Sequence, residues 1–89
     1  MTKKHYDARI LTNFILRSTP GIRKSQEYKK QRDQIIDETM SCDRKEAIEW
    51  MDHYMGQAIA AGKGRRDDRI RTRFLAAYDL QTELANIKN

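Results

Sequence analysis

The sequence predicts an all-α fold, a compact bundle of three or four helices with a long C-terminal helix, and three observations lead to this prediction. Apolar residues recur at intervals of three and four residues through most of the chain, which is the periodicity of a helix with one buried face. No stretch alternates polar and apolar residues as a strand would, and no Asn-Gly or Asp-Gly hairpin signal occurs. One proline and four glycines leave few positions that interrupt a helix.

The first predicted helix spans about residues 5–17, before a break at Pro20 and Gly21. Its apolar residues form two neighbouring rows and are expected to face the core: Tyr6, Ile10, Leu11, Phe14 and Ile15. The second helix ends near Met40, and two starts remain open for it. Pro20 suits the first helical position, and Ser25 suits an N-cap. Its narrow apolar stripe consists of Tyr28, Ile35, Ile36 and Met40.

The third and fourth predicted helices have clear start signals. Asp43 with Glu46 has the spacing of a capping box, and Gly62 is the expected C-cap of a helix ending at residue 60 or 61. The apolar face of this third helix is wide and includes Trp50, which predicts a central position in the bundle. The fourth helix runs from about residue 67 to 87, with this apolar stripe: Ile70, Phe74, Ala77, Tyr78, Leu80, Leu84 and Ile87.

Length and composition indicate one helical domain over residues 1–89. Cys42 is the only cysteine, so no disulfide within the chain is expected and a reducing compartment suits it. The N-terminal residues are charged with no apolar run behind them, and no stretch approaches the roughly 20 apolar residues of a membrane span. These features predict a cytoplasmic protein without a membrane partner.

Positive charge is concentrated in two parts of the sequence. The chain has 18 Lys and Arg against 13 Asp and Glu, a formal net charge of +5, and its pI is about 9.6. Residues 1–24 hold six basic residues and one acidic residue, and residues 63–89 hold seven and four, whereas residues 25–62 are slightly acidic. This distribution favours an anionic partner, either nucleic acid or an acidic protein surface.

The densest basic run spans residues 62–73, at the predicted start of the last helix. Arginine predominates there, and its guanidinium group binds phosphate in a bidentate manner beside the free amides of a helix start. The predicted nucleic-acid or anion site therefore consists of Lys63, Arg65, Arg66, Arg69 and Arg73, with support from Lys3, Lys4, Arg23 and Lys24. In a purely structural interpretation, Arg71 pairs with Asp67 instead, and Arg73 covers the edge of the core. The two basic segments form one patch only if the first helix packs beside the start of the last.

Two other interpretations remain open. The chain is alternatively a protein-binding adaptor or inhibitor, of the phage or mobile-element type in size and composition, which docks on a host protein through Leu80, Leu84 and Ile87. The same stripe suits a homodimer. In a helix-turn-helix interpretation, residues 41–43 form the turn and Arg44 contacts DNA, although Glu49 and Asp52 would then face phosphates.

No group of residues in the sequence has the pattern of a catalytic or metal site. His5 and His53 are isolated, and the spacing of Glu49 and His53 predicts a surface ion pair. Cys42 and His53 lack the close spacing of zinc ligands, and Gly62-Lys-Gly-Arg lacks that of a phosphate loop. We therefore expect a non-enzymatic regulatory or accessory protein with no cofactor and no small-molecule substrate, which binds nucleic acid or a nucleoprotein machine.

Overall fold

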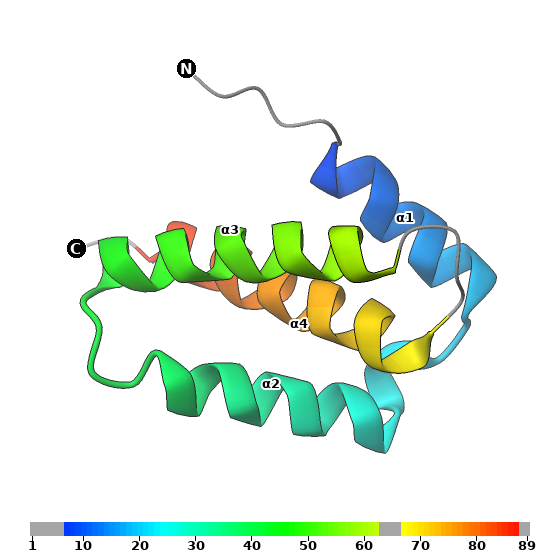
Figure 1. The fold of residues 1–89 in the computed structure, drawn as a ribbon, viewed down its shortest axis with the longest axis horizontal. Coiled ribbons are helices and arrows are strands. Elements are labelled where there is room, and N and C mark those ends of the chain that lie inside the picture. The colour runs from blue at the N-terminus through cyan, green and yellow to red at the C-terminus, as the bar shows by residue number, and fades with distance from the viewer. Residues whose placement is uncertain (1–6, 63–66, 88–89) are drawn as a thin grey trace.

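The computed structural model describes residues 7–62 and 67–87, and these residues are helical with no strand among them (Figure 1). The described elements are four α-helices and one short 3-10 helix, η1: α1 (Ala8–Ser18), η1 (Ile22–Lys24), α2 (Gln26–Glu38), α3 (Arg44–Ala61) and α4 (Asp68–Ala85). This confirms the predicted all-α fold and its long C-terminal helix.

Local side-chain signals set the starts of the last three α-helices. The side-chain oxygens of Ser25, Asp43 and Asp67 each accept a hydrogen bond from a backbone N–H two or three residues later, at 2.8–3.1 Å. Of the two starts considered for the second helix, the structure has the one capped by Ser25. The chain between α1 and α2 turns at Gly21, whose φ of 79° is in the left-handed region that favours glycine.

The predicted C-cap at Gly62 is confirmed, and the reason for a glycine there is close packing. Its N–H donates to the Ala58 carbonyl at 2.9 Å, and its φ is −91° rather than positive. A Cβ at this position would lie 2.8 Å from Cγ2 of Ile70. Glycine therefore lets the end of α3 approach the first turn of α4.

α4 is the central helix, with α2 and α3 packed against it on two sides (Figure 1). α2 and α4 run in the same direction and α3 runs in the opposite one. The fully buried Ala76 and Ala77 let both neighbours approach closely. The prediction that the third helix is central is wrong, because Trp50 on its wide apolar face is 47% exposed. The core residues from α4 are Phe74, Leu75, Ala76, Ala77 and Leu80.

α1 lies across the end of the bundle where α4 begins (Figure 1). Thr12 and Ile15 on its inner side are buried. The expected core positions Ile10 and Phe14 are 67% and 56% exposed, so this part of the sequence prediction is wrong, and Tyr6 lies outside the described residues. Because α1 packs mainly on one helix, only one narrow row of its side chains is covered.

The apolar stripe predicted for the second helix divides in the same way. Tyr28 and Ile35 are buried, whereas Ile36 and Met40 are exposed. Within the described ranges, no helix is both long enough and apolar enough to cross a membrane.

Candidate nucleic-acid interface

Three arginines near the start of α4 lie on two different faces of the helix. Helical geometry places Arg69 and Arg73 on one face and Arg71 on the other. Nη1 of Arg71 donates to Oγ of Ser18 at 3.0 Å and to Oγ1 of Thr19 at 2.7 Å. The Arg71 guanidinium carbon also lies 5.7 Å from the centre of the Phe14 ring. Arg71 therefore holds the C-terminal end of α1 against α4 rather than pairing with an acid of its own helix.

The Arg73 side chain ties α4 to both of the other long helices. Its Nη2 lies 3.0 Å from Oε1 of Glu38, and its Nη1 donates to Oε1 of Gln31 at 3.5 Å. Its guanidinium carbon is 4.6 Å from the centre of the Tyr54 ring, a cation–π distance. Burial, together with the Glu38 carboxylate, raises the pKa of Tyr54. With these partners, Arg73 stabilises the packing of α4 against α2 and α3.

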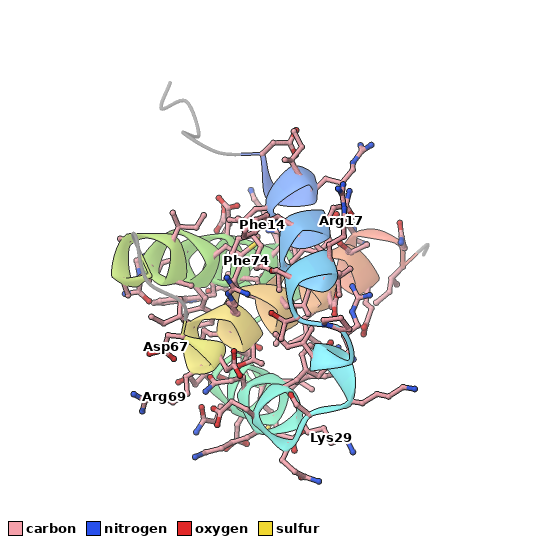
Figure 2. The ribbon with its side chains drawn as sticks, turned by 90° about the vertical axis from the view of Figure 1, so that its right-hand side faces the viewer. Phe14, Arg17, Lys29, Asp67, Arg69 and Phe74 are labelled. Carbon is pink, nitrogen blue, oxygen red and sulfur yellow. The ribbon has the colours of Figure 1, made fainter. Side chains whose placement is uncertain are left out.

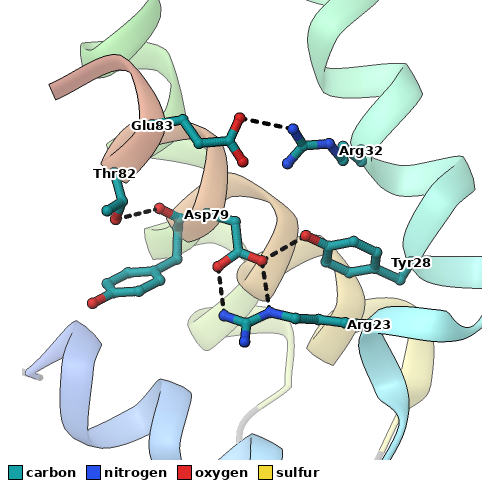
Figure 3. A network of polar contacts seen from close by, with 7 residues as sticks. Arg23, Tyr28, Arg32, Asp79, Thr82 and Glu83 are labelled. Carbon is teal, nitrogen blue, oxygen red and sulfur yellow. Dashed lines mark hydrogen bonds and ion pairs between the residues drawn. The ribbon is translucent and has the colours of Figure 1, made fainter. Parts of the chain in front are cut away.

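Arg23 is held in a second polar network, which joins η1 and α2 to α4 (Figure 3). Its Nε donates to Oδ2 of Asp79 at 3.0 Å and its Nη2 to Oδ1 at 2.7 Å, while the Tyr28 hydroxyl donates to Oδ2 at 2.5 Å. The hydrogen bond to Asp79 raises the pKa of Arg23. Burial, then the hydrogen bond to Asp79, raises the pKa of Tyr28 to about 12. This network also gives Arg23 a structural role.

Exposed cations from four elements lie at the end of the molecule where α1 meets α4. Arg17 lies in the last turn of α1, and Arg69 lies in the first turn of α4. Lys24 ends η1 and Lys29 follows in the first turns of α2. All four are exposed, and none forms an ion pair with another described residue. We call these four residues, Arg17, Lys24, Lys29 and Arg69, the basic end. Figure 2 labels Arg17, Lys29 and Arg69 at separate points of this end, with Asp67 beside Arg69.

Arg69 also lines a surface groove between α4, α2 and α3, together with Asp67 and Arg73. Gln31 and Gln57 contribute amides to the lining, and Asp67 is the acid among the lining residues. One oxygen of the Asp67 carboxylate accepts the Arg69 backbone N–H at 2.9 Å. Of the two arginines that line this groove, Arg73 pairs with Glu38, whereas Arg69 forms no ion pair with another described residue.

The structure divides the predicted anion-binding residues into three groups. Arg69 and Lys24 are exposed at the basic end, whereas Arg23 and Arg73 are held in ion pairs. Outside the described residues lie Lys3, Lys4, Lys63, Arg65 and Arg66. The sequence prediction omitted Arg17 and Lys29. Their position beside the chain breaks at residues 18–25 is the signal that would have included them.

The predicted protein-docking stripe near the C-terminus is only partly exposed. Leu80 is 6% exposed and lies in the core, and Leu84 is partly buried against it. Ile87 is 48% exposed. Of the three predicted residues, Ile87 alone has a largely exposed side chain.

The described residues contain no group of three or more His, Cys, Asp and Glu side chains placed to hold a metal ion. No protein-family model, no curated protein and no solved structure matches this chain. The function is therefore inferred from the charges and contacts of the chain itself.

Proposed function

We propose that this protein is a non-enzymatic regulatory or accessory factor that binds nucleic acid through its basic end. The observation that carries the proposal is the contact of Arg71 with Ser18 and Thr19. This contact joins the C-terminal end of α1 to the first turns of α4. Exposed cations that are far apart in the sequence thus share one surface, which is the arrangement that a phosphate backbone requires.

The expected contacts are with phosphates rather than with base edges. Arg69 stands in the first turn of α4, where the Asp67 carboxylate already caps the helix, so its guanidinium rather than the helix end is the expected phosphate contact. Arg17, Lys24 and Lys29 supply three further exposed cations around it. Flexible, exposed cations of this kind position a protein on nucleic acid without reading its sequence. We therefore expect binding that is strongly dependent on salt and weakly dependent on sequence.

The test is fluorescence anisotropy with labelled duplex DNA, single-stranded DNA and RNA at low salt. The double variant Arg17→Ala/Arg69→Ala removes two cations of the basic end that have no structural partner among the described residues. We expect it to weaken binding about ten-fold, since each exposed charge pair contributes on the order of 0.5 to 1 kcal/mol. The matched control is Arg44→Ala/Lys45→Ala, which removes two exposed cations at the opposite end of the bundle.

The control variant also tests the helix-turn-helix interpretation. In that interpretation, Arg44 is at the start of the recognition helix and its loss weakens DNA binding. The structure gives Arg44 a different contact, a hydrogen bond from its Nη1 to the Ile87 carbonyl at 3.1 Å. If the control variant loses more affinity than the Arg17→Ala/Arg69→Ala variant, the proposal for the basic end is wrong.

Protein docking is the second candidate function, and the exposure of two isoleucines favours it. Arg32 and Glu83 pair at 2.8 Å across the parallel helices α2 and α4, and Ile36 and Ile87 follow one turn later on each chain segment. Both isoleucines are exposed. A complex through these isoleucines would tolerate salt and would be weakened by Ile36→Ser/Ile87→Ser, without any change in affinity for nucleic acid.

A further inference from the structure

The outward face of α3 differs in charge from the basic end. Six of its exposed residues lie along one face by their helical spacing: Glu46, Glu49, Trp50, His53, Gln57 and Ala60. The exposed cations of α3, Arg44 and Lys45, lie in its first turn outside this row, and Lys45 is one turn from Glu49. This row holds two acids and no lysine or arginine, in a chain with a net charge of +5. The same face repels phosphate, so nucleic-acid binding at the basic end makes no use of it.

Trp50 is at the centre of this row, in a shallow depression lined by Glu46, Glu49, Trp50 and His53. The His53 ring meets the indole nearly at a right angle, with ring centres 5.6 Å apart, and the Tyr54 ring lies 5.9 Å away. The predicted ion pair between Glu49 and His53 is replaced by this aromatic contact. Neighbouring rings therefore support the indole while nearly half of its surface stays exposed.

We propose that this depression binds an arginine or lysine side chain from a basic segment of a partner polypeptide. A guanidinium or ammonium group within about 6 Å of an indole face is attracted by the ring, and indole is the strongest such acceptor among side chains. Glu46 and Glu49 flank the ring one turn apart and supply the carboxylates to which that cation donates charge-assisted hydrogen bonds. Aromatic surface and acid together define the ligand as an organic cation.

Charge and shape favour a polypeptide partner over the other cationic occupants. A metal ion requires a cluster of three or more ligating side chains, which the described part of α3 does not provide. A second copy of this chain also carries a net charge of +5, so overall repulsion opposes self-docking at the low salt that favours the pairing. The depression is open along one helix, which suits a side chain projecting from an extended segment.

Trp50 is the only tryptophan in the chain, so its intrinsic fluorescence reports directly on this depression. The probe is an eight-residue peptide of alternating arginine and glycine, titrated into the full chain at low salt, with a glutamine–glycine peptide for comparison. We expect the arginine peptide to change Trp50 emission saturably and the glutamine peptide to leave it unchanged. Equal responses to the two peptides would overturn the proposal.

Three substitution pairs complete the test. Glu46→Gln/Glu49→Gln is expected to raise the Kd for the arginine peptide about five-fold or more, whereas Asp33→Asn/Asp37→Asn makes the same charge change on the exposed face of α2 and should change it less than two-fold. Equal effects of these two variants would overturn the proposal. So would a shift of Trp50 emission in Lys3→Gln/Lys4→Gln without peptide, or on concentrating the protein alone, since each identifies another occupant.

Discussion

Replacing Asp79 by Asn should destabilise the fold, and by more than the corresponding replacement of the exposed Glu83 on the same helix. The Asp79 side chain is 13% exposed and accepts three hydrogen bonds, two from Arg23 and one from Tyr28. Arg23 is nearly half exposed and regains water when the carboxylate is lost, so its share is on the order of 0.5 to 1 kcal/mol. Tyr28 is buried, and the asparagine amide keeps one acceptor oxygen, so its hydroxyl exchanges a hydrogen bond to a carboxylate for a weaker neutral one, at a cost of about 1 kcal/mol.

Together these contributions give a loss of about 1.5 to 2 kcal/mol for Asp79→Asn. The matched control is Glu83→Gln on the same helix, where one ion pair with Arg32 is lost and the carboxylate is 56% exposed, so we expect a loss below about 0.5 kcal/mol. The assay is urea unfolding followed by helical circular dichroism, with an unchanged slope as the check on two-state behaviour. In a double-mutant cycle with Tyr28→Phe, the coupling to Asp79 should be about 1 kcal/mol.

Equal losses in the Asp79 and Glu83 variants would refute this reasoning, because they would mean that burial does not distinguish the two carboxylates. A coupling near zero would separately show that the hydrogen bond between Tyr28 and Asp79 contributes nothing to stability.

The remaining predictions concern pH, packing and backbone conformation. Because folding raises the pKa of Tyr28 from its ordinary 10.0 to about 12, the free energy of unfolding should hold its full value below pH 10. It should then fall by roughly 2 to 3 kcal/mol as the pH rises to 12. Urea titrations at alkaline pH should show this loss in the wild type and not in Tyr28→Phe. Thermal unfolding should show a loss of about 2 to 4 kcal/mol for Ile15→Ala, which removes a buried side chain, and of at most about 0.5 kcal/mol for Ile10→Ala, which removes an exposed one. Similar losses in the two variants would mean that Ile10 is also in the core. Gly21→Ala should destabilise by about 1 kcal/mol because φ there is 79°, whereas Gly56→Ala, inside α3 with open space for a Cβ, should stabilise by roughly 0.5 to 1 kcal/mol. The same sign for both glycines would contradict the backbone assignment.

Helix boundaries were predictable because their causes are local. Ser25, Asp43 and Asp67 cap their helices with bonds to residues two or three positions away, so sequence alone contains both partners. The end of α3 at Gly62 follows from the same kind of signal, although the contact with Ile70 that explains the glycine is long-range.

The buried faces were less predictable because they depend on which helix lies opposite. On α1, periodicity identifies two adjacent apolar rows, and packing on α4 covers the row of Ile15 while leaving Phe14 exposed. Trp50 fits an apolar face by spacing, yet no helix covers it. α4 is central because the small, fully buried Ala76 and Ala77 let helices pack closely on both of its sides. The small size of these two residues does not by itself predict this position.

The basic end was predicted only in part, for a similar reason. Spacing placed Arg69 and Arg73 on one face, but the Glu38 partner of Arg73 and the Asp79 partner of Arg23 come from distant positions in the chain. Those ion pairs decide which arginines remain unpaired, and sequence spacing contains no information about them.

The most direct test of nucleic-acid binding at the basic end is the salt dependence of duplex DNA affinity. The quantity to measure is the slope of log K against log salt concentration for the wild type, Arg17→Ala/Arg69→Ala and Arg44→Ala/Lys45→Ala. Each lost phosphate contact removes about 0.9 from the slope, so we predict a slope shallower by about 1.8 in the first variant and unchanged in the second. A wild-type slope near zero, or equal slopes in all three proteins, would contradict phosphate binding by Arg17 and Arg69.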